Sequence, residues 1–297
     1  MGRVHPSSRL VSRILAQGIQ SGRRALSAVL TERDREARSL ADVTDLEIPG
    51  PTAPLTARFY RSTSSTEPLA LLLFFHGGGF AFGDIGTHDA LCRRLAHGTK
   101  VAVLSVDYRL APEHAWPAQR DDAEAALRWL LQVYPDTAAS RIPLILGGDS
   151  AGGYLALDLT RQINRETPGT VALTCLIYPL LHLDDDLWKT ANAGLRPIGR
   201  AAVHVIRARL VQSPPNLLEA GAASDPPCVL TYGGLADPVR PDCQAYEAAL
   251  RTVGIPVHVG EFKSLPHGYA NMTHLLPPAR AAIDETARLL RRALEEA

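Results

Sequence analysis

Short apolar runs alternate with amphipathic stretches along most of this 297-residue chain, and this alternation restricts the fold more than any other feature. From residues 69–75 onward, most of the β-like runs are continuously apolar. Such runs are typical of strands that are buried on both faces of a parallel sheet. Strand followed by helix, repeated, predicts an α/β fold in which helices cover both faces of a doubly wound sheet.

Eight strands and five longer helices are expected from the periodicity of apolar residues and from the Pro, Gly and Asp residues at the joins. The strands are expected at 43–48, 55–60, 69–75, 101–106, 143–147, 171–177, 227–232 and 255–262. The helices are expected at 87–98, 117–134, 151–165, 241–253 and 279–296. The first two strands alternate or carry charge, which indicates an antiparallel edge.

The same pattern divides the chain into a main domain and a small cap. Residues 41–297 carry the strand–helix alternation and are expected to form the main domain. Residues 1–40 contain apolar residues at helical spacing, and the stretch from about 180–222 interrupts the alternation. We expect these two parts to form a small helical cap over the ends of the strands.

Composition favours a small molecule as the partner. The chain carries 31 basic and 31 acidic residues, so no net charge attracts nucleic acid or an anionic membrane. No run of 18 apolar residues occurs, and no stable membrane insertion is expected. The four cysteines form no CxxC pair, which indicates neither a zinc site nor a disulfide framework. Reduced, buried thiols suit a cytoplasmic protein, and the oligomeric state, including a homodimer, is left open.

The turns that leave the strands are where chemistry is expected, because ligands bind beyond the carboxyl ends of the strands in such sheets. Residues 148–152 read Gly-Asp-Ser-Ala-Gly and match G-x-S-x-G. The glycines permit a sharp strand-to-helix turn that exposes the hydroxyl of Ser150. Small residues crowd any tight turn, so the motif alone is weak. Its position between an apolar strand and an amphipathic helix favours Ser150 as a nucleophile.

A serine nucleophile needs a base, and the base needs an orienting acid. Among ten histidines, His267 follows the last strand and precedes the last helix, which places it at the same edge of the sheet as Ser150. The preceding turn, GGLADPVRPD, offers two acids. Asp237 comes first and is followed by proline, whereas Asp242 stands where the next helix would take a capping carboxylate. Asp237 is the expected acid, and Asp242 is the alternative.

Three consecutive glycines, residues 77–79, follow the third strand in FFHGGGFAFG. No Lys-Ser or Lys-Thr pair follows them, and their spacing does not fit G-x-G-x-x-G, so a phosphate cradle is not favoured. Beside a serine nucleophile, the backbone N–H groups of glycines can instead donate to the oxyanion that forms when the serine attacks a carbonyl. Each such donor is worth about a hundred- to a thousandfold in rate. Replacing Gly78 with a bulkier residue is expected to damage turnover more than folding.

Five ordered motifs, HGGGF (76–80), DYRLAPEHAWPA (107–118), GDSAGG (148–153), ADPV (236–239) and LPHGY (265–269), resemble those of the bacterial hormone-sensitive-lipase-like esterases. The resemblance extends from about residue 40 to the C-terminus, and the order serine, aspartate, histidine fits it. It implies an α/β-hydrolase fold with an eight-stranded, mostly parallel sheet and a small helical cap. It also implies a cytoplasmic serine carboxylesterase that hydrolyses short- to medium-chain acyl esters through an acyl-enzyme, without a cofactor.

The resemblance assigns a role to each candidate site residue. Ser150 would be the nucleophile, His267 the general base and Asp237 its orienting acid. The oxyanion donors would be Gly78, Gly79 and Ala151. His76 would brace the glycine loop, and Gly77 would let it turn. A structural polar network would comprise Asp84, Asp107, Tyr108, Arg109 and Glu113.

Two departures from the family pattern limit what is carried over. Val239 stands where the family has leucine, and residues 180–226 look shortened, so no cap or acyl-pocket residue is assigned there. An amidase or lactonase with the same triad is the first alternative. A non-catalytic small-ligand receptor on this fold is the second, but such a receptor is expected to lack a triad member, and none is missing here.

Overall fold

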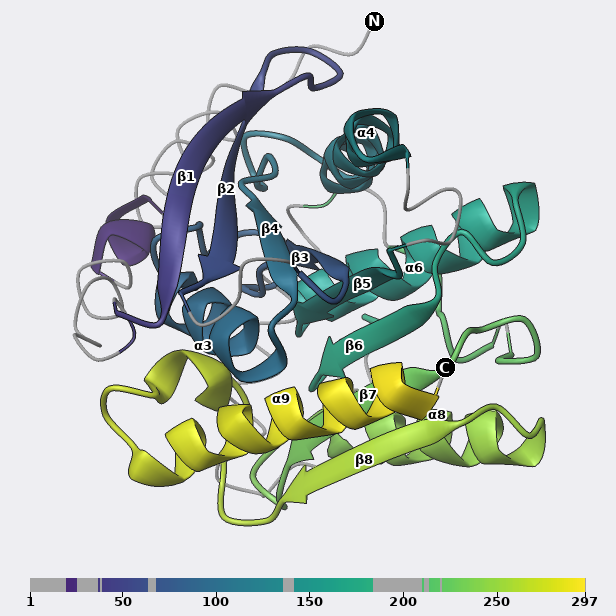
Figure 1. Ribbon diagram of the computed structural model, residues 1–297. Helices are drawn as coiled ribbons and strands as arrows, with labels where there is room; N and C mark the ends of the chain where they lie inside the picture. Colours follow the sequence, from purple (N-terminus) through teal and green to yellow (C-terminus); the bar gives the residue numbers. More distant parts are fainter. Residues whose placement is uncertain are drawn as a thin grey trace, which may run out of the picture.

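An eight-stranded sheet lies at the centre of the computed structural model, which describes residues 20–25, 37, 39–63, 68–135, 142–183, 210, 214–219 and 221–296 (Figure 1). The strands are β1 (Ala41–Ile48), β2 (Leu55–Ser62), β3 (Leu71–Phe75), β4 (Ala102–Val106), β5 (Leu144–Asp149), β6 (Leu173–Ile177), β7 (Cys228–Gly233) and β8 (Val257–Phe262). Their order across the sheet is β1-β2-β4-β3-β5-β6-β7-β8. The predicted strands and the α/β fold class are confirmed.

Burial of the strands follows the direction in which they pair. β1 is antiparallel to β2, and β2 is antiparallel to β4. The remaining neighbours pair in parallel from β4 to β8. Every residue of β3, β4, β5, β6 and β7 is buried, whereas most of β1 is exposed. The antiparallel edge predicted from the charged first strands is therefore confirmed.

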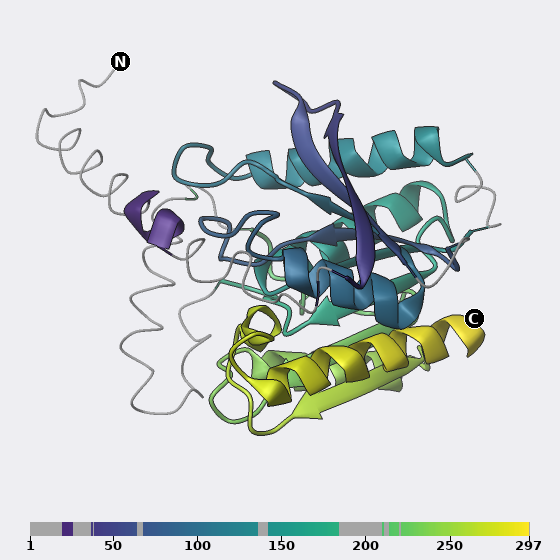
Figure 2. The ribbon, with the colours of Figure 1, turned by 60° about the vertical axis from the view of Figure 1, so that its left-hand side comes forward.

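Helices cover both faces of the sheet. α3 (Asp89–Thr99) and α9 (Pro277–Glu296) pack together on one face (Figures 1 and 2). α4 (Ala118–Val133), α6 (Ala151–Glu166) and α8 (Arg240–Thr252) lie on the other. The apolar stripe of each helix faces the sheet, as in α9, where Ile283, Ala287 and Leu290 are buried. No helix within the described ranges is long and apolar enough to cross a membrane.

The predicted cap falls largely outside the described residues. Of its N-terminal part, 1–40, the structure describes 20–25, which are helical, together with 37, 39 and 40. Of its inserted part, 180–222, it describes 180–183, 210, 214–219, 221 and 222. The cap and the division of the chain into two parts remain predictions.

The carboxyl ends of the parallel strands meet at one edge of the sheet. Residues 76–83 follow β3, Ser150 follows β5, residues 234–239 follow β7, and residues 263–268 lie between β8 and a 3₁₀ turn, η1 (Tyr269–Met272). Because these strands are hydrogen-bonded in parallel, their turns lie at the same edge although they are far apart in sequence. All of the predicted site residues belong to these turns except Ala151, which is the first residue of α6.

Candidate active site

Ser150 occupies a sharp turn between β5 and α6. Its backbone has φ 52° and ψ −117°, a left-handed conformation that costs free energy in any residue other than glycine. Two backbone hydrogen bonds hold the turn: the Ser150 N–H donates to the Ile177 carbonyl at 3.0 Å, and the Leu180 N–H donates to the Ser150 carbonyl at 2.9 Å. The strained conformation is the sharp strand-to-helix turn that G-x-S-x-G predicts.

His267 and Asp237 complete a hydrogen-bond chain that begins at Ser150. The Ser150 Oγ lies 2.9 Å from His267 Nε2, and His267 Nδ1 lies 2.9 Å from Asp237 Oδ1. A carboxylate can only accept a hydrogen bond, so Nδ1 carries the proton and Nε2 is left to accept from the serine hydroxyl. The structure thus brings together the three residues that the sequence singled out.

Backbone donors fix the buried carboxylate of Asp237. Its Oδ2 accepts from the Gly233 N–H at 3.0 Å, and its Oδ1 accepts from the Val239 N–H at 3.1 Å. Burial favours a neutral ring at His267, but the charge and hydrogen bond of Asp237 outweigh burial and raise the pKa of His267 above its usual value. The arrangement therefore stabilises the imidazolium that would form when the serine loses its proton.

Asp242, the alternative acid, lies elsewhere. It stands in the first turn of α8 but makes no capping hydrogen bond, so the capping role expected from the sequence is wrong. Its carboxylate lies 3.1 Å from His182 Nε2. The side chain that contacts His267 is Asp237.

The glycine loop turns at Gly78, Gly79 and Phe80, whose φ values are 118°, 62° and 62°. The Phe82 N–H closes this turn on the Gly78 carbonyl at 2.9 Å. Gly77 has a different task from the turn predicted for it: its N–H donates to Asp149 at 2.8 Å, and a Cβ there would collide with the same carboxylate. We call residues 77–82 the glycine turn.

A substitution at Gly78 would harm folding as well as turnover, because a Cβ at this position would collide with the Phe82 carbonyl. The expectation that turnover would be damaged more than folding stays a prediction. Among the described residues, none accepts a hydrogen bond from the backbone N–H of Gly78, Gly79 or Ala151. These N–H groups are therefore available to a ligand at the edge of the sheet where Ser150 lies.

His76 is fully buried beneath the glycine turn. Its Nδ1 donates to the Gly77 carbonyl at 2.8 Å, and its ring stacks on Tyr108 with 4.2 Å between ring centroids. The Tyr108 hydroxyl donates to the His76 carbonyl at 2.7 Å. Burial, with a smaller effect from nearby His88, lowers the pKa of His76 to about 4, so the ring is neutral near pH 7. A neutral, stacked ring is suited to bracing the loop.

Comparison with known proteins agrees with this fold and geometry. The family described as "alpha/beta hydrolase fold" matches residues 72–271, which is more than half of the chain. The chain belongs to the α/β-hydrolase family.

Relatives of this α/β-hydrolase carry esterase names. It is 33% identical to Esterase LipI of Mycobacterium tuberculosis over 261 residues, which cover 84% of this chain and 81% of LipI. It is 37% identical to the Carboxylic ester hydrolase LipN of the same organism over 269 residues, which cover 84% and 70% of the two chains. A solved esterase of Pyrobaculum calidifontis aligns with a TM-score of 0.81 at 26% identity, covering 98% of this chain and 99% of that chain.

The sequence did not reveal a buried ion pair beneath the site of this α/β-hydrolase. Asp149 and His88 approach to 3.1 Å, and each side chain is only 3% exposed. Burial opposes both charges, yet the pair lowers the pKa of Asp149 and raises that of His88. The one signal available was an acidic residue inside G-x-S-x-G, at a position that the strand–turn–helix geometry buries.

Asp149 also links the turn at Ser150 to the segment that contains His267 and η1. The Tyr178 hydroxyl donates to Asp149 at 3.3 Å and accepts from the Ala270 N–H at 3.2 Å. The amide nitrogen of Asn271 lies 2.9 Å from His88 Nε2. Both routes end in η1, directly after His267, so the carboxylate connects three of the turns that form the site.

Three of the residues expected to form a structural polar network each have a charged or polar partner outside that set. Arg109 forms an ion pair with Asp122 at 2.7 Å, and Glu113 pairs with Arg23 at 2.9 Å. The Asp84 carboxylate accepts from the Thr87 N–H at 2.7 Å. These contacts order the loops after β3 and β4.

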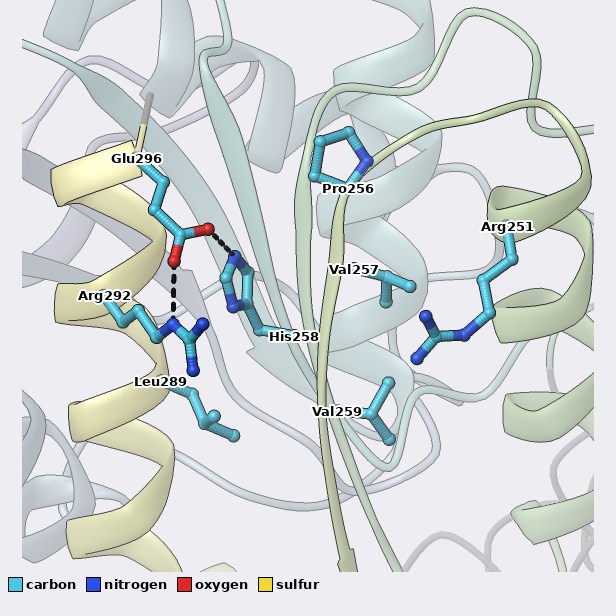
Figure 3. Close-up of a pocket in the computed structure, with 8 residues that line it drawn as sticks. All are labelled: Arg251, Pro256, Val257, His258, Val259, Leu289, Arg292 and Glu296. Atoms are coloured by element: carbon cyan, nitrogen blue, oxygen red, sulfur yellow. Dashed lines mark hydrogen bonds and ion pairs between the residues drawn. The ribbon is translucent and has the colours of Figure 1, made fainter.

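A separate pocket lies along the first half of β8, at the end of the sheet opposite the triad (Figure 3). Its walls are Arg251, Pro256, Val257, His258, Val259, Leu289, Arg292 and Glu296. His258 and Arg292 both point to Glu296, at 3.5 Å and 2.7 Å. Within the described ranges, no group of three His, Cys, Asp or Glu residues could hold a metal ion, here or elsewhere.

Proposed function

We propose that this protein is a serine carboxylesterase in which Ser150 is the nucleophile, His267 the general base and Asp237 the orienting acid. The observation that carries the proposal is the unbroken chain from Ser150 Oγ through His267 to Asp237, with both contacts at 2.9 Å. Membership of the α/β-hydrolase family, and relatives named as esterases, support an ester as the substrate.

Acylation begins when Ser150 Oγ attacks the ester carbonyl carbon. The hydroxyl proton passes to His267 Nε2, and the carbonyl oxygen becomes an oxyanion, while Asp237 holds the imidazolium by its Nδ1–H. When the tetrahedral intermediate collapses, the bond to the alcohol oxygen breaks and His267 gives its proton to that oxygen. The alcohol leaves, and the acyl group remains on Ser150.

Deacylation repeats these steps with water. Water transfers a proton to His267 as its oxygen attacks the acyl carbon, and the bond to Ser150 Oγ then breaks as the serine recovers a proton from His267. The carboxylic acid is released. Every proton in the cycle moves through His267, so we propose no metal or organic cofactor.

The oxyanion donors in this proposal are the N–H groups of Gly78, Gly79 and Ala151. Their lack of acceptors among the described residues supports this role. Ala151 is also the first residue of α6, whose N-terminal dipole favours negative charge. In the proposal, His76 braces the glycine turn, the Gly77 N–H ties the start of the turn to Asp149, and neither residue touches the substrate.

We propose short- to medium-chain acyl esters as the substrate range. The rings of Phe80, Trp116 and Tyr154 contact one another edge to face, with centroids 5.6 to 5.8 Å apart, beside the glycine turn. In the proposal, these buried rings limit the length of acyl chain that can lie beside the glycine turn. A cytoplasmic location is part of the proposal, because all four cysteines are buried free thiols and such thiols suit a reducing compartment.

Hydrolysis of p-nitrophenyl acetate and butyrate tests the proposal. Ser150→Ala is expected to lower kcat by at least about 10⁴-fold without a matching loss of thermal stability. The control is Ser264→Ala, since Ser264 is an exposed serine near His267 and its replacement is expected to leave the rate unchanged. Activity retained in Ser150→Ala would disprove the nucleophile. A panel that adds anilides and lactones tests substrate class, and faster cleavage of either would overturn the ester assignment.

A further inference from the structure

Arg23 joins the helical residues 20–25 to the loops that follow β3 and β4. Its Nε donates to the Ala81 carbonyl at 2.7 Å, and its Nη2 donates to the Ala111 carbonyl at 2.6 Å. The same guanidinium pairs with both oxygens of Glu113, at 3.1 and 2.9 Å. Figures 1 and 2 show this short helical segment, in purple, on the side of the molecule toward which the arrows of β6 and β8 point.

The two carbonyls that Arg23 binds belong to the loops after β3 and β4, and a hydrogen bond joins these loops. Ala81 belongs to the glycine turn, and its N–H donates to the Gly78 carbonyl at 3.1 Å. The neighbouring Phe80 carbonyl accepts from the Ala111 N–H at 2.9 Å. Arg23 thus closes a ring of hydrogen bonds that runs from Ala81 through Phe80 to Ala111. Phe80 and Ala81 directly follow Gly79 in the glycine turn.

The chemistry of the guanidinium suits this position. Its donors form a rigid planar fork, and a lysine ammonium could not hold two carbonyls and a carboxylate in the same geometry. Charge-assisted hydrogen bonds are about twice as strong as neutral ones, and the Arg23 side chain is only 23% exposed. Gly22 brings the helix close, since a Cβ there would lie 3.3 Å from the Phe82 ring. The segment therefore packs against the glycine turn itself.

We propose that Arg23 is a positioning residue for ester hydrolysis: its guanidinium fixes the glycine turn so that Gly78 and Gly79 aim their N–H groups at the oxyanion. The inference rests on the function proposed above. Arg23 touches neither the substrate nor the triad and acts through the backbone of the turn. Arg23 then supports the glycine turn from a segment that precedes the first strand.

We expect Arg23→Ala to lower kcat by less than the loss of an oxyanion donor does, but by more than a substitution far from the site does. Removal of one donor costs about a hundred- to a thousandfold in rate, and a misplacement of about 1 Å costs about a hundredfold. Arg23→Ala should therefore lower kcat by about 10- to 100-fold with little change in KM, because the oxyanion exists only beyond the ground state. Arg23→Lys should recover part of the loss.

Arg24→Ala is the matched control. Arg24 is the next residue of the same helix and is exposed, with its Nε 3.4 Å from the Gln20 carbonyl. Its replacement removes an arginine from the segment without touching the glycine turn. Esterase activity in this variant should equal that of the wild type. Glu113→Gln gives a second, milder test, since it removes the counter-charge but leaves the carbonyl contacts of Arg23, and a loss of less than about tenfold is expected.

Inhibitor binding separates positioning from a general structural role. A trifluoromethyl ketone with a short alkyl chain forms a hemiketal oxyanion with the serine, whereas the matched methyl ketone binds as a ground-state ketone. In Arg23→Ala, Ki for the trifluoromethyl ketone should rise in parallel with the loss of kcat/KM. Ki for the methyl ketone and the unfolding midpoint should stay close to wild type.

Three outcomes would overturn the inference. An unchanged kcat in Arg23→Ala would do so, as would equal weakening of both ketones. If Arg23→Ala does not fold, full activity in both Arg23→Lys and Glu113→Gln would also refute it. Failure of the proposed function is recognised separately, because it would appear as activity retained in Ser150→Ala with Arg23 intact.

Discussion

Replacing Asp149 with asparagine would remove a buried charge that contacts both the glycine turn and the residues leading to η1. The carboxylate accepts from the Gly77 N–H at 2.8 Å and lies 3.1 Å from His88. Asparagine keeps the shape of the side chain but carries no charge. The buried His88 would then have to lose its proton or remain charged without its counter-ion.

The size of the effect follows from the burial of both partners, each 3% exposed. Breaking a buried ion pair from one side costs about 3–5 kcal/mol, and loss of the His88 proton brings the cost toward the lower value. About 3 kcal/mol corresponds to a fall in Tm of roughly 5 °C for a chain of 297 residues, at an unfolding entropy of about 2.1 cal/mol/K per residue. Because Gly77 begins the glycine turn, a shift of about 1 Å there should lower kcat about a hundredfold.

The effect on stability should depend on pH with a definite sign. His88 has a raised pKa, so its contribution is fully present below about pH 6.5 and is lost as pH rises through its folded-state pKa. Asp149 has a lowered pKa, so its contribution is present above about pH 4 and is lost as pH falls through its folded-state pKa. The difference between wild type and Asp149→Asn should be largest between these values and should shrink at alkaline pH.

Urea unfolding at about pH 5.5 and about pH 9, with kcat measured on p-nitrophenyl butyrate, tests this reasoning. Asp121→Asn is the control, because Asp121 is an exposed aspartate and should change stability by less than about 0.5 kcal/mol. A double-mutant cycle with His88→Asn should give a coupling energy above about 1 kcal/mol. If Asp149→Asn unfolded within about 0.5 kcal/mol of wild type at both pH values and kept its kcat, the ion pair would not have the role described.

Two further predictions concern the triad and the glycine turn. Asp237→Asn should lower kcat about 10⁴-fold. It should also move the acid limb of kcat/KM to lower pH, because the carboxylate raises the pKa of His267. Asp242→Asn should change little in the same pH–rate profile, and the reverse result would assign the orienting role to Asp242. Gly78→Ala should lower both Tm and expression, because a Cβ at this position would collide with the Phe82 backbone. Gly79→Ala should lower the free energy of unfolding by only about 1 kcal/mol, because alanine is strained at a positive φ. Equal falls in Tm in the two variants would contradict this.

Much of the fold could be predicted because local patterns determine it. Buried parallel strands need continuous apolar runs, and the run at Leu71–Phe75 is buried at every position. His267 could be singled out by its place after the last strand, without knowledge of its contacts. Proline after Asp237 correctly separated that acid from Asp242 as the partner of His267.

The remainder of the site depends on approaches between distant segments, which no local pattern encodes. His88 and Asn271 are 183 residues apart in sequence but lie in contact, and Arg23 reaches Ala81 across 58 residues. The role of Gly77 was predicted incorrectly for the same reason. Three adjacent glycines look alike in sequence, and only the position of Asp149 shows that the first is needed for close approach and the next two for the turn.

The placement of His267 after the outermost strand also affects how the protein becomes active. The nucleophile and the base are 117 residues apart, and β6, β7 and β8 lie between them in the chain. Parallel pairing over such distances is slow, because the entropy of closing long loops is lost before the contacts form. Neither a nascent chain that ends before β8 nor a collapsed intermediate with an undocked edge can hold the triad. Recovery of esterase activity therefore requires that β8 has already joined the sheet.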